Sequence, residues 1–124
     1  MRLSSFRLLT LVVTAALFAA CNKEKPTTAI ITIQDESGAP IPEAYVKLYA
    51  NPTLPEGDRL TQEKMTDAAG QASFDYTDFY KQGQAGFAVM DIVSFKDTMV
   101  GQGIIKILEE ETNNETVTLV PVTP

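Results

Sequence analysis

Few side chains in this sequence have the chemistry of a reactive or metal-binding site. The 124 residues include a single cysteine, Cys21, and no histidine or tryptophan. Zinc, copper, haem and iron–sulfur sites draw mainly on histidine and cysteine, and Ser–His–Asp and Cys–His nucleophiles need a histidine. We therefore expect no cofactor and no catalysis of these kinds. Carboxylates, lysines, hydroxyl groups, tyrosines and oxygen-ligand calcium remain available.

Cys21 follows a segment with the pattern of an export signal. Arg2 and Arg7 form a cationic start, and the chain is uncharged from Leu8 to Ala20. A cationic start, an apolar stretch of ~7–15 residues and small residues before a cleavage site are typical of a secretory signal peptide. A membrane-spanning helix needs about 20 apolar residues, which this segment lacks. We expect residues 1–20 to be removed.

The small residues before Cys21 make the segment resemble a bacterial lipoprotein signal, although Phe18 stands where that family prefers leucine. The resemblance implies that Cys21 becomes the first residue of the mature protein and carries lipid, and two or more acyl chains anchor a protein stably. Lipidation also explains an exported chain with one unpaired thiol. Asn22 is not the aspartate of an inner-membrane retention signal, and residues 23–25 are mixed in charge. We therefore expect an outer-membrane anchor on the side facing the periplasm.

The remainder fits one domain, over residues 28–124, joined to the anchor by a lipidated tether over residues 21–27. Removing residues 1–20 takes away two arginines and no acid, so the net charge changes from −6 to −8. An acidic surface argues against nucleic acid and anionic head groups as partners. The membrane is then reached through the lipid on Cys21, and the expected partner is another envelope protein, with a glycan as the alternative.

Short runs rich in β-branched and aromatic residues alternate with turn signals along this domain. About seven strands with turns every ~8–12 residues indicate an all-β, immunoglobulin-like sandwich. No stretch has sustained helical periodicity, so alternating α/β folds are not expected. The predicted strands are Thr28–Gln34, Ala44–Tyr49, Leu60–Thr66, Ala72–Tyr76, Phe87–Phe95, Thr98–Leu108 and Thr116–Val122.

Three local features interrupt this alternation. Residues 77–84 could form one helical turn, with Asp78 as its cap. Gly101 and Gly103 predict a bulge or a bend in a long strand. Residues 109–115 predict an acidic turn before the last strand.

Three segments together resemble the carboxypeptidase regulatory-like domain, a seven-stranded Greek-key sandwich of transthyretin-like fold. Residues 31–48 contain Asp-x-x-Gly-x-Pro-Ile-x-x-Ala-x-Val-x-Leu, residues 66–74 contain Thr-Asp-x-x-Gly-x-x-x-Phe, and residues 117–119 read Val-Thr-Leu. The resemblance implies the fold and says little about function, because this domain is a common addition to envelope proteins. Glu43 stands where the family usually has glycine.

The two motif turns also have a mechanical interpretation. Gly38 and Gly70 end four-residue turns that need a positive φ or close backbone approach. Asp35 and Asp67 can accept backbone N–H bonds in Asx-turns. Together with Glu36, these two aspartates could bind calcium only if their loops met, and we expect capping instead.

Other candidate sites have simple alternatives. The triplet Glu109–Glu111 could be a binding knob, but a short charge run is usually a solvated turn. Asp75 and Asp78 could do acid–base chemistry only across a cleft, which a domain of this size leaves little room to form. Thr98, between Asp97 and Met99, resembles the Asp-Ser/Thr-apolar acceptor of a bacterial O-glycosylation system, although so short a pattern also arises by chance.

The leading functional prediction is a non-enzymatic, lipid-anchored cell-envelope protein whose sandwich makes protein–protein contacts as an accessory or scaffold subunit. A carbohydrate- or peptide-binding module is an alternative, because aromatic residues could form a stacking surface. A second alternative is an accessory lipoprotein of a secretion machine, with the Asn51–Arg59 loop as its docking loop. The aromatic residues in question are Tyr45, Tyr49, Tyr76, Phe79 and Tyr80.

Overall fold

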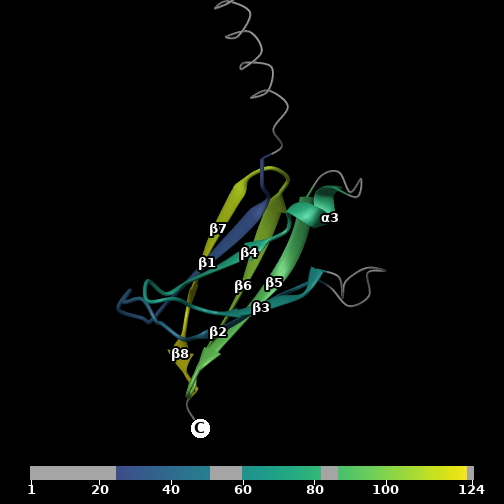
Figure 1. Ribbon diagram of the computed structural model, residues 1–124. Coiled ribbons are helices and arrows are strands. Elements are labelled where there is room, and N and C mark those ends of the chain that lie inside the picture. The colour runs from purple at the N-terminus through teal and green to yellow at the C-terminus, as the bar shows by residue number, and fades with distance from the viewer. Residues whose placement is uncertain (1–24, 51–59, 82–86, 123–124) are drawn as a thin grey trace, which may run out of the picture.

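Two β-sheets pack face to face across an apolar core (Figure 1). This architecture comes from a computed structural model that describes residues 25–50, 60–81 and 87–122. The elements are β1 (Thr28–Gln34), β2 (Tyr45–Tyr49), β3 (Gln62–Met65), β4 (Gln71–Asp75), α3 (Thr77–Lys81), β5 (Phe87–Lys96), β6 (Met99–Leu108), β7 (Thr112–Thr118) and β8 (Val120–Pro121). The predicted all-β sandwich is confirmed.

The strands divide unequally between the two sheets. One sheet has three strands in the order β4-β1-β7, and the other has five in the order β3-β2-β5-β6-β8. The pairing of β1 with β7 is parallel, and the other pairings are antiparallel. The consecutive pairs β2–β3 and β5–β6 stay within the larger sheet, while the chain changes sheet after β1, β3, β4, β6 and β7.

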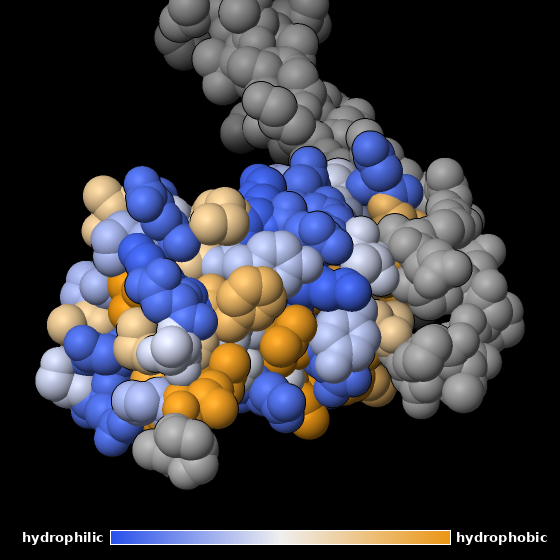
Figure 2. All heavy atoms as spheres, turned by 90° about the horizontal axis from the view of Figure 1, so that it is seen from below, coloured by the Kyte–Doolittle hydropathy of each residue, from blue (hydrophilic) through white to orange (hydrophobic). Residues whose placement is uncertain are grey.

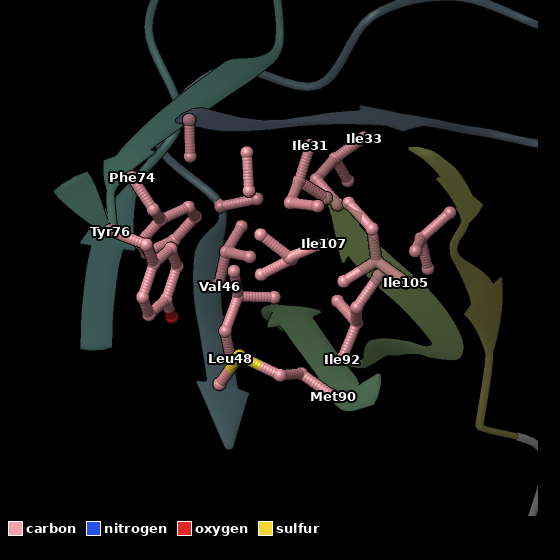
Figure 3. Packing of buried hydrophobic residues seen from close by; sticks show 14 of the residues in the cluster. Ile31, Ile33, Val46, Leu48, Phe74, Tyr76, Met90, Ile92, Ile105 and Ile107 are labelled. Atoms are coloured by element: carbon pink, nitrogen blue, oxygen red, sulfur yellow. The ribbon is translucent and has the colours of Figure 1, made fainter. Parts of the chain in front are cut away.

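Alternation along the strands builds the core, because successive side chains of a strand point to opposite faces. In β1, Ala29, Ile31 and Ile33 are fully buried while their neighbours are half-buried. Figure 3 shows β1 side chains meeting those of β2, β5 and β6 across the gap between the sheets. The largest fully buried apolar side chains are Phe74, Ile31, Ile33, Leu48, Met90, Ile92, Ile107, Leu119 and Val46.

The segment predicted as one last strand, Thr116–Val122, is divided between two strands, β7 and β8, which belong to different sheets. β7 begins at Thr112 rather than Thr116, and it pairs with β1 as far as Thr118. Leu119 is then fully buried, and Val120 pairs with Val100 of β6 in the other sheet. The chain therefore crosses from one sheet to the other over a single residue.

Of the bulge or bend predicted at Gly101 and Gly103, the bulge is absent. β5 and β6 pair one for one from Phe87–Leu108 to Lys96–Met99, glycines included. The glycines instead make room for the crossing chain, because a Cβ on Gly101 would lie 2.7 Å from the carbonyl oxygen of Thr118. A Cβ on Gly103 would lie 3.1 Å from a methyl group of Val117.

The helix predicted near Phe79 forms, but Asp78 is not its cap. α3 begins at Thr77, which places Asp78 inside the first turn. Asp75 performs the capping role, because its carboxylate accepts hydrogen bonds from the Thr77 amide at 2.9 Å and the Thr77 hydroxyl at 2.6 Å. No helix within the described residues is long and apolar enough to span a bilayer.

Buried polar side chains close the end of the sandwich at which the chain enters β1. Thr27 is buried, and its hydroxyl accepts a hydrogen bond from the Glu110 amide at 2.8 Å. Asn113 is buried in β7, where its amide nitrogen donates to carbonyl oxygens of Thr28, Leu108 and Glu111. Its side-chain oxygen accepts a hydrogen bond from the Leu108 amide at 3.0 Å. These bonds explain why polar residues 112–115 continue a strand.

Candidate interaction surface

Apolar side chains form one line across the outer face of the five-stranded sheet. The pairing register sets Tyr45 opposite both Met65 and Phe95, Phe95 opposite Val100, and Val100 opposite Val120. Directly paired residues of neighbouring strands project from the same face. We call this line the apolar row: Met65, Tyr45, Phe95, Val100 and Val120.

The apolar row is open to solvent. Met65 is 58% exposed, Phe95 46%, Val120 44% and Val100 42%, and Tyr45 is partly buried. The rings of Tyr45 and Phe95 stack with their centroids 4.7 Å apart. Strands lie ~4.8 Å apart in a sheet, so the apolar row is about 19 Å long. Figure 2, which views the molecule from the end where β8 lies in Figure 1, shows apolar side chains on the surface there.

The next rows of the same face are mixed in polarity. Lys47 lies opposite Glu63 and Val93, and Val93 lies opposite Gln102. The next row sets Asp91 opposite Tyr49 and Ile104. On its inner side, the apolar row is therefore bordered by charged and amide side chains, with Val93 as the apolar exception.

A hollow of about 550 Å³ opens at the Tyr45 end of the apolar row. Its walls are Tyr45, Met65 and Phe95 from the apolar row, together with Glu43, Lys96 and Asp97. The hollow is therefore lined by three apolar or aromatic side chains and three charged ones. Its three charged groups sum to one net negative charge.

Two residues of this hollow adopt a backbone conformation that is uncommon outside glycine. Glu43 has a φ of 57° and Asp97 a φ of 52°, which is the left-handed region. Glu43 is held there by a hydrogen bond from its amide to the Thr66 carbonyl at 3.0 Å. The Lys96 ammonium is directed to the Pro42 carbonyl at 2.6 Å. The two turns thus place both residues at the same end of the five-stranded sheet, beside the start of β2 and the end of β5.

Tyr45 is chemically distinct from an ordinary surface tyrosine. Desolvation raises the pKa of its hydroxyl, and Glu63 raises the pKa further by accepting a hydrogen bond and by its negative charge.

The outer face of the three-stranded sheet is different. Around the central strand, Thr28, Ile30, Thr32 and Gln34 are half-buried, and Ile30 is the one apolar side chain among them. Residues paired with them on the flanking strands are polar: Gln71, Ser73, Asp75, Thr112, Asn114, Thr116 and Thr118. This polar face offers no counterpart of the apolar row.

The sequence-based candidates are only partly brought together. Thr98 lies on the β5–β6 turn and is exposed, next to Asp97 of the hollow. Its modification stays a prediction. Cys21 and the Asn51–Arg59 loop lie outside the described residues.

The aromatic stacking surface is not formed as predicted. Tyr76 is buried in the core, where its hydroxyl donates to the Leu60 carbonyl at 2.9 Å and burial raises its pKa. Phe79 packs against the core, and the side chain of Tyr80 lies outside the described residues. Of the predicted set, Tyr45 and Tyr49 lie on the outward side of β2, where they alternate with inward-facing residues. Phe95 of the neighbouring strand β5 stacks on Tyr45, a partner that the sequence did not reveal.

The carboxylates act as caps. Asp35 accepts hydrogen bonds from the amides of Ser37 at 2.9 Å and Ala39 at 3.0 Å. Asp67 accepts from Ala69 at 2.9 Å and Gln71 at 3.0 Å. The predicted Asx-turns are confirmed, and the described residues hold no group of three carboxylate, cysteine or histidine side chains suited to a metal ion.

The acidic triplet Glu109–Glu111 lies at the other end of the sandwich from the hollow. Glu109, Glu110 and Glu111 are exposed between β6 and β7, and Glu110 has a φ of 58°. They lie at the end where β1 begins, because the Thr28 amide donates to the Glu111 carbonyl at 3.0 Å. The triplet is thus far from the hollow.

Comparisons with known proteins identify the fold alone. Neither a protein-family model nor a curated protein matches the sequence. Among solved structures, the chain is similar to 3-chlorocatechol 1,2-dioxygenase from Rhodococcus opacus 1CP, with a TM-score of 0.52 and 14% identity over 82% of this chain and 62% of that chain. It is also similar to catechol 1,2-dioxygenase from Acinetobacter radioresistens, with a TM-score of 0.52 and 14% identity over 80% of this chain and 53% of that chain. The chain spans only about half to three-fifths of these enzymes, and this likeness assigns no activity to it.

Proposed function

We propose that the chain is a non-enzymatic lipoprotein of the cell envelope whose five-stranded face binds another envelope protein in an accessory or scaffold role. The observation that carries the proposal is the apolar row, which crosses all five strands in the open. Contiguous exposed apolar patches on soluble domains mark interaction sites. The lipoprotein-like segment ending at Cys21 supports anchoring in the outer membrane, facing the periplasm.

The position of the apolar row suits a protein partner better than the membrane. Thr28, where the chain enters β1, lies beside Thr112, and Val120 follows Thr112 by 8 residues along a nearly extended path. At ~3.3 Å per residue, the apolar row lies on the order of 25 Å from the Thr28 end of the sandwich. In Figure 1 these are opposite ends of the molecule. An anchor at Cys21 would hold the apolar row away from the lipid.

The resemblance to the carboxypeptidase regulatory-like domain belongs to the same proposal. Its motif residues adopt conformations that the motif needs, with φ of 88° at Gly38 and 74° at Gly70. A Cβ on Gly70 would lie 2.7 Å from the Ile33 carbonyl, which explains glycine at that position. Domains of this type are common additions to envelope proteins.

The test is chemical cross-linking of the native envelope, followed by recovery of the tagged chain and mass spectrometry. Three variants are compared with the wild type: Cys21→Ala, Phe95→Lys and Ser73→Lys. We expect one recurrent protein that is reduced in Cys21→Ala, lost in Phe95→Lys and retained in Ser73→Lys. Ser73 is the matched control because it is exposed on the outward side of β4 in the polar face.

Other results would redirect the proposal. Recovery of the same protein with Phe95→Lys would show that the apolar row is not the binding surface. Recovery of glycan without protein would favour the carbohydrate-binding alternative, which the exposed Tyr45–Phe95 stack supports. The secretion-machine alternative rests on the Asn51–Arg59 loop and predicts a partner that is lost on deletion of that loop.

A further inference from the structure

We propose that the apolar row and its hollow form a site for a short basic–apolar segment of the partner: at least two apolar side chains on the row and a lysine or arginine in the hollow. This inference rests on the proposed function and names the chemistry of the partner. It draws on the size of the apolar row, on the charges around the hollow and on the form of the hollow.

The size of the apolar row suits a short segment. A large side chain such as an aromatic one has ~150–250 Å² of surface that it can bury. Because the five side chains of the apolar row are only partly exposed, together they offer a partner on the order of 400 Å². A stable protein–protein interface buries about 800 Å² on each partner. A rigid second copy packed on the apolar row alone would fall well short of that area, whereas a peptide segment needs less.

The charges around the apolar row favour a cationic ligand. Glu43 and Asp97 line the hollow, and Glu63 lies in the next row, where it faces Lys47. The ammonium of Lys96, the lysine that lines the hollow, already contacts the Pro42 carbonyl. A lysine or arginine of the partner would meet both carboxylates of the hollow.

The same charges disfavour a second copy. Two copies would each bring a net charge of −8 after loss of residues 1–20, and the carboxylates of both hollows would approach each other. Like-charge contacts at an interface suppress association. A basic segment has neither difficulty.

The form of the hollow is set by backbone that is already in place. The left-handed conformations of Glu43 and Asp97 hold the two turns on either side of the stacked rings. Strained backbone of this kind concentrates at binding sites. The segment therefore meets a hollow whose two carboxylates stand on turns of defined backbone conformation.

The test is selection of a random twelve-residue peptide library, displayed on phage, against the purified full chain as cells produce it. We expect enriched peptides to combine at least two apolar residues with lysine or arginine. One enriched peptide, measured by fluorescence anisotropy, should bind at least tenfold more weakly to Phe95→Ser and unchanged to Ser73→Lys. The combined variant Glu43→Lys/Asp97→Lys should lose this peptide and select acidic ones instead.

A gentler pair keeps the test decisive if the charge-reversed chain does not fold. Glu43→Gln/Asp97→Asn preserves side-chain size. This variant should bind the same peptide at least fivefold more weakly, and its binding should depend less on salt concentration. No enrichment, enrichment of peptides without cations, or binding that is indifferent to both pairs would overturn the inference. These measurements use no envelope component, so their failure is separate from failure of the cross-linking experiment.

Discussion

The two outer faces of this sandwich are built by the same alternation and end with opposite surfaces. The three-stranded sheet presents hydroxyl, amide and carboxylate groups on almost every outward position. The five-stranded sheet presents the apolar row at one end, mixed side chains in the middle and an exposed apolar pair, Phe87 and Leu108, at the other end. Both sheets contribute buried inward residues to the same core, although the edge strand β3 has the exposed Lys64 on that side.

This difference teaches that core formation does not explain the apolar row. A sheet with one solvated face normally has polar residues outside, as the three-stranded sheet shows. Exposed apolar residues scattered singly need no explanation, but five in register across five strands do. Edge strands with exposed apolar residues also carry a risk of aggregation. A binding role accounts for a feature that folding alone does not require.

The largest expected effect comes from breaking the crossing that carries the apolar row onto β8. Gly101→Ala places a Cβ against backbone of Thr118, so we expect the free energy of unfolding to fall by about 3 kcal/mol. Gly103→Ala meets side chains alone, a methyl group of Val117 closely and Ile92 at ordinary contact distance, and should cost about 1 kcal/mol. Urea unfolding measures both. Equal costs would show that the crossing does not depend on Gly101.

Sequence reasoning recovered the faces but not the apolar row. Residues 28–34 and 45–49 alternate so clearly that their inward side chains could be assigned. The members of the apolar row lie between positions 45 and 120 and come together only through the register of four strand pairs. Hydrophobic pattern assigns a residue to a face, but it does not say which residues of other strands lie beside it.

The local turns were predictable and the last strands were not. Asp35 and Asp67 act within four residues of themselves, so their Asx-turns are written in local sequence. Residues 112–115 are polar and resemble a turn, yet Asn113 is buried by hydrogen bonds to residues as distant as Thr28. Tertiary hydrogen bonds thus override the weak strand propensity of that segment.

Two buried hydroxyl groups test how the sheet under the apolar row is supported. The Thr66 hydroxyl accepts from the Ala44 amide at 2.8 Å and donates to the Ile41 carbonyl at 2.7 Å. Thr66→Val leaves both groups unpaired next to Tyr45, so we expect a loss of about 2 kcal/mol in thermal or urea unfolding.

Ser94 is the matched contrast. It is fully buried directly before Phe95, and its hydroxyl has no hydrogen-bond partner among the described residues. Ser94→Ala removes an unpaired polar atom, so we expect stability to stay equal or rise by about 1 kcal/mol. A clear loss would reveal that the hydroxyl has a partner.

A double-mutant cycle sharpens the comparison at the stacked rings. Tyr45→Ala and Phe95→Ala should each lower stability modestly, and their coupling energy should be about 1 kcal/mol. The equivalent cycle on the polar face, Thr32→Ala with Gln71→Ala, should show coupling near zero, although these residues are also directly paired. Comparable coupling on both faces would contradict a distinct role for the stack.

The smallest expected effect concerns Asp35, at the turn that leaves the three-stranded sheet. The Ser37 hydroxyl lowers the pKa of this carboxyl below 3.8, with backbone amides adding to the shift. Because the folded pKa is depressed, the contribution to stability is complete above the unfolded pKa and is lost as pH falls through the folded one. Ser37→Ala should move the pKa of Asp35 back toward 3.8 in an NMR titration, whereas Ser73→Ala should leave it in place. Peptide binding at pH 7 should be identical in both variants, because the polar side of the sandwich acts on its own turns and the apolar row acts on the partner.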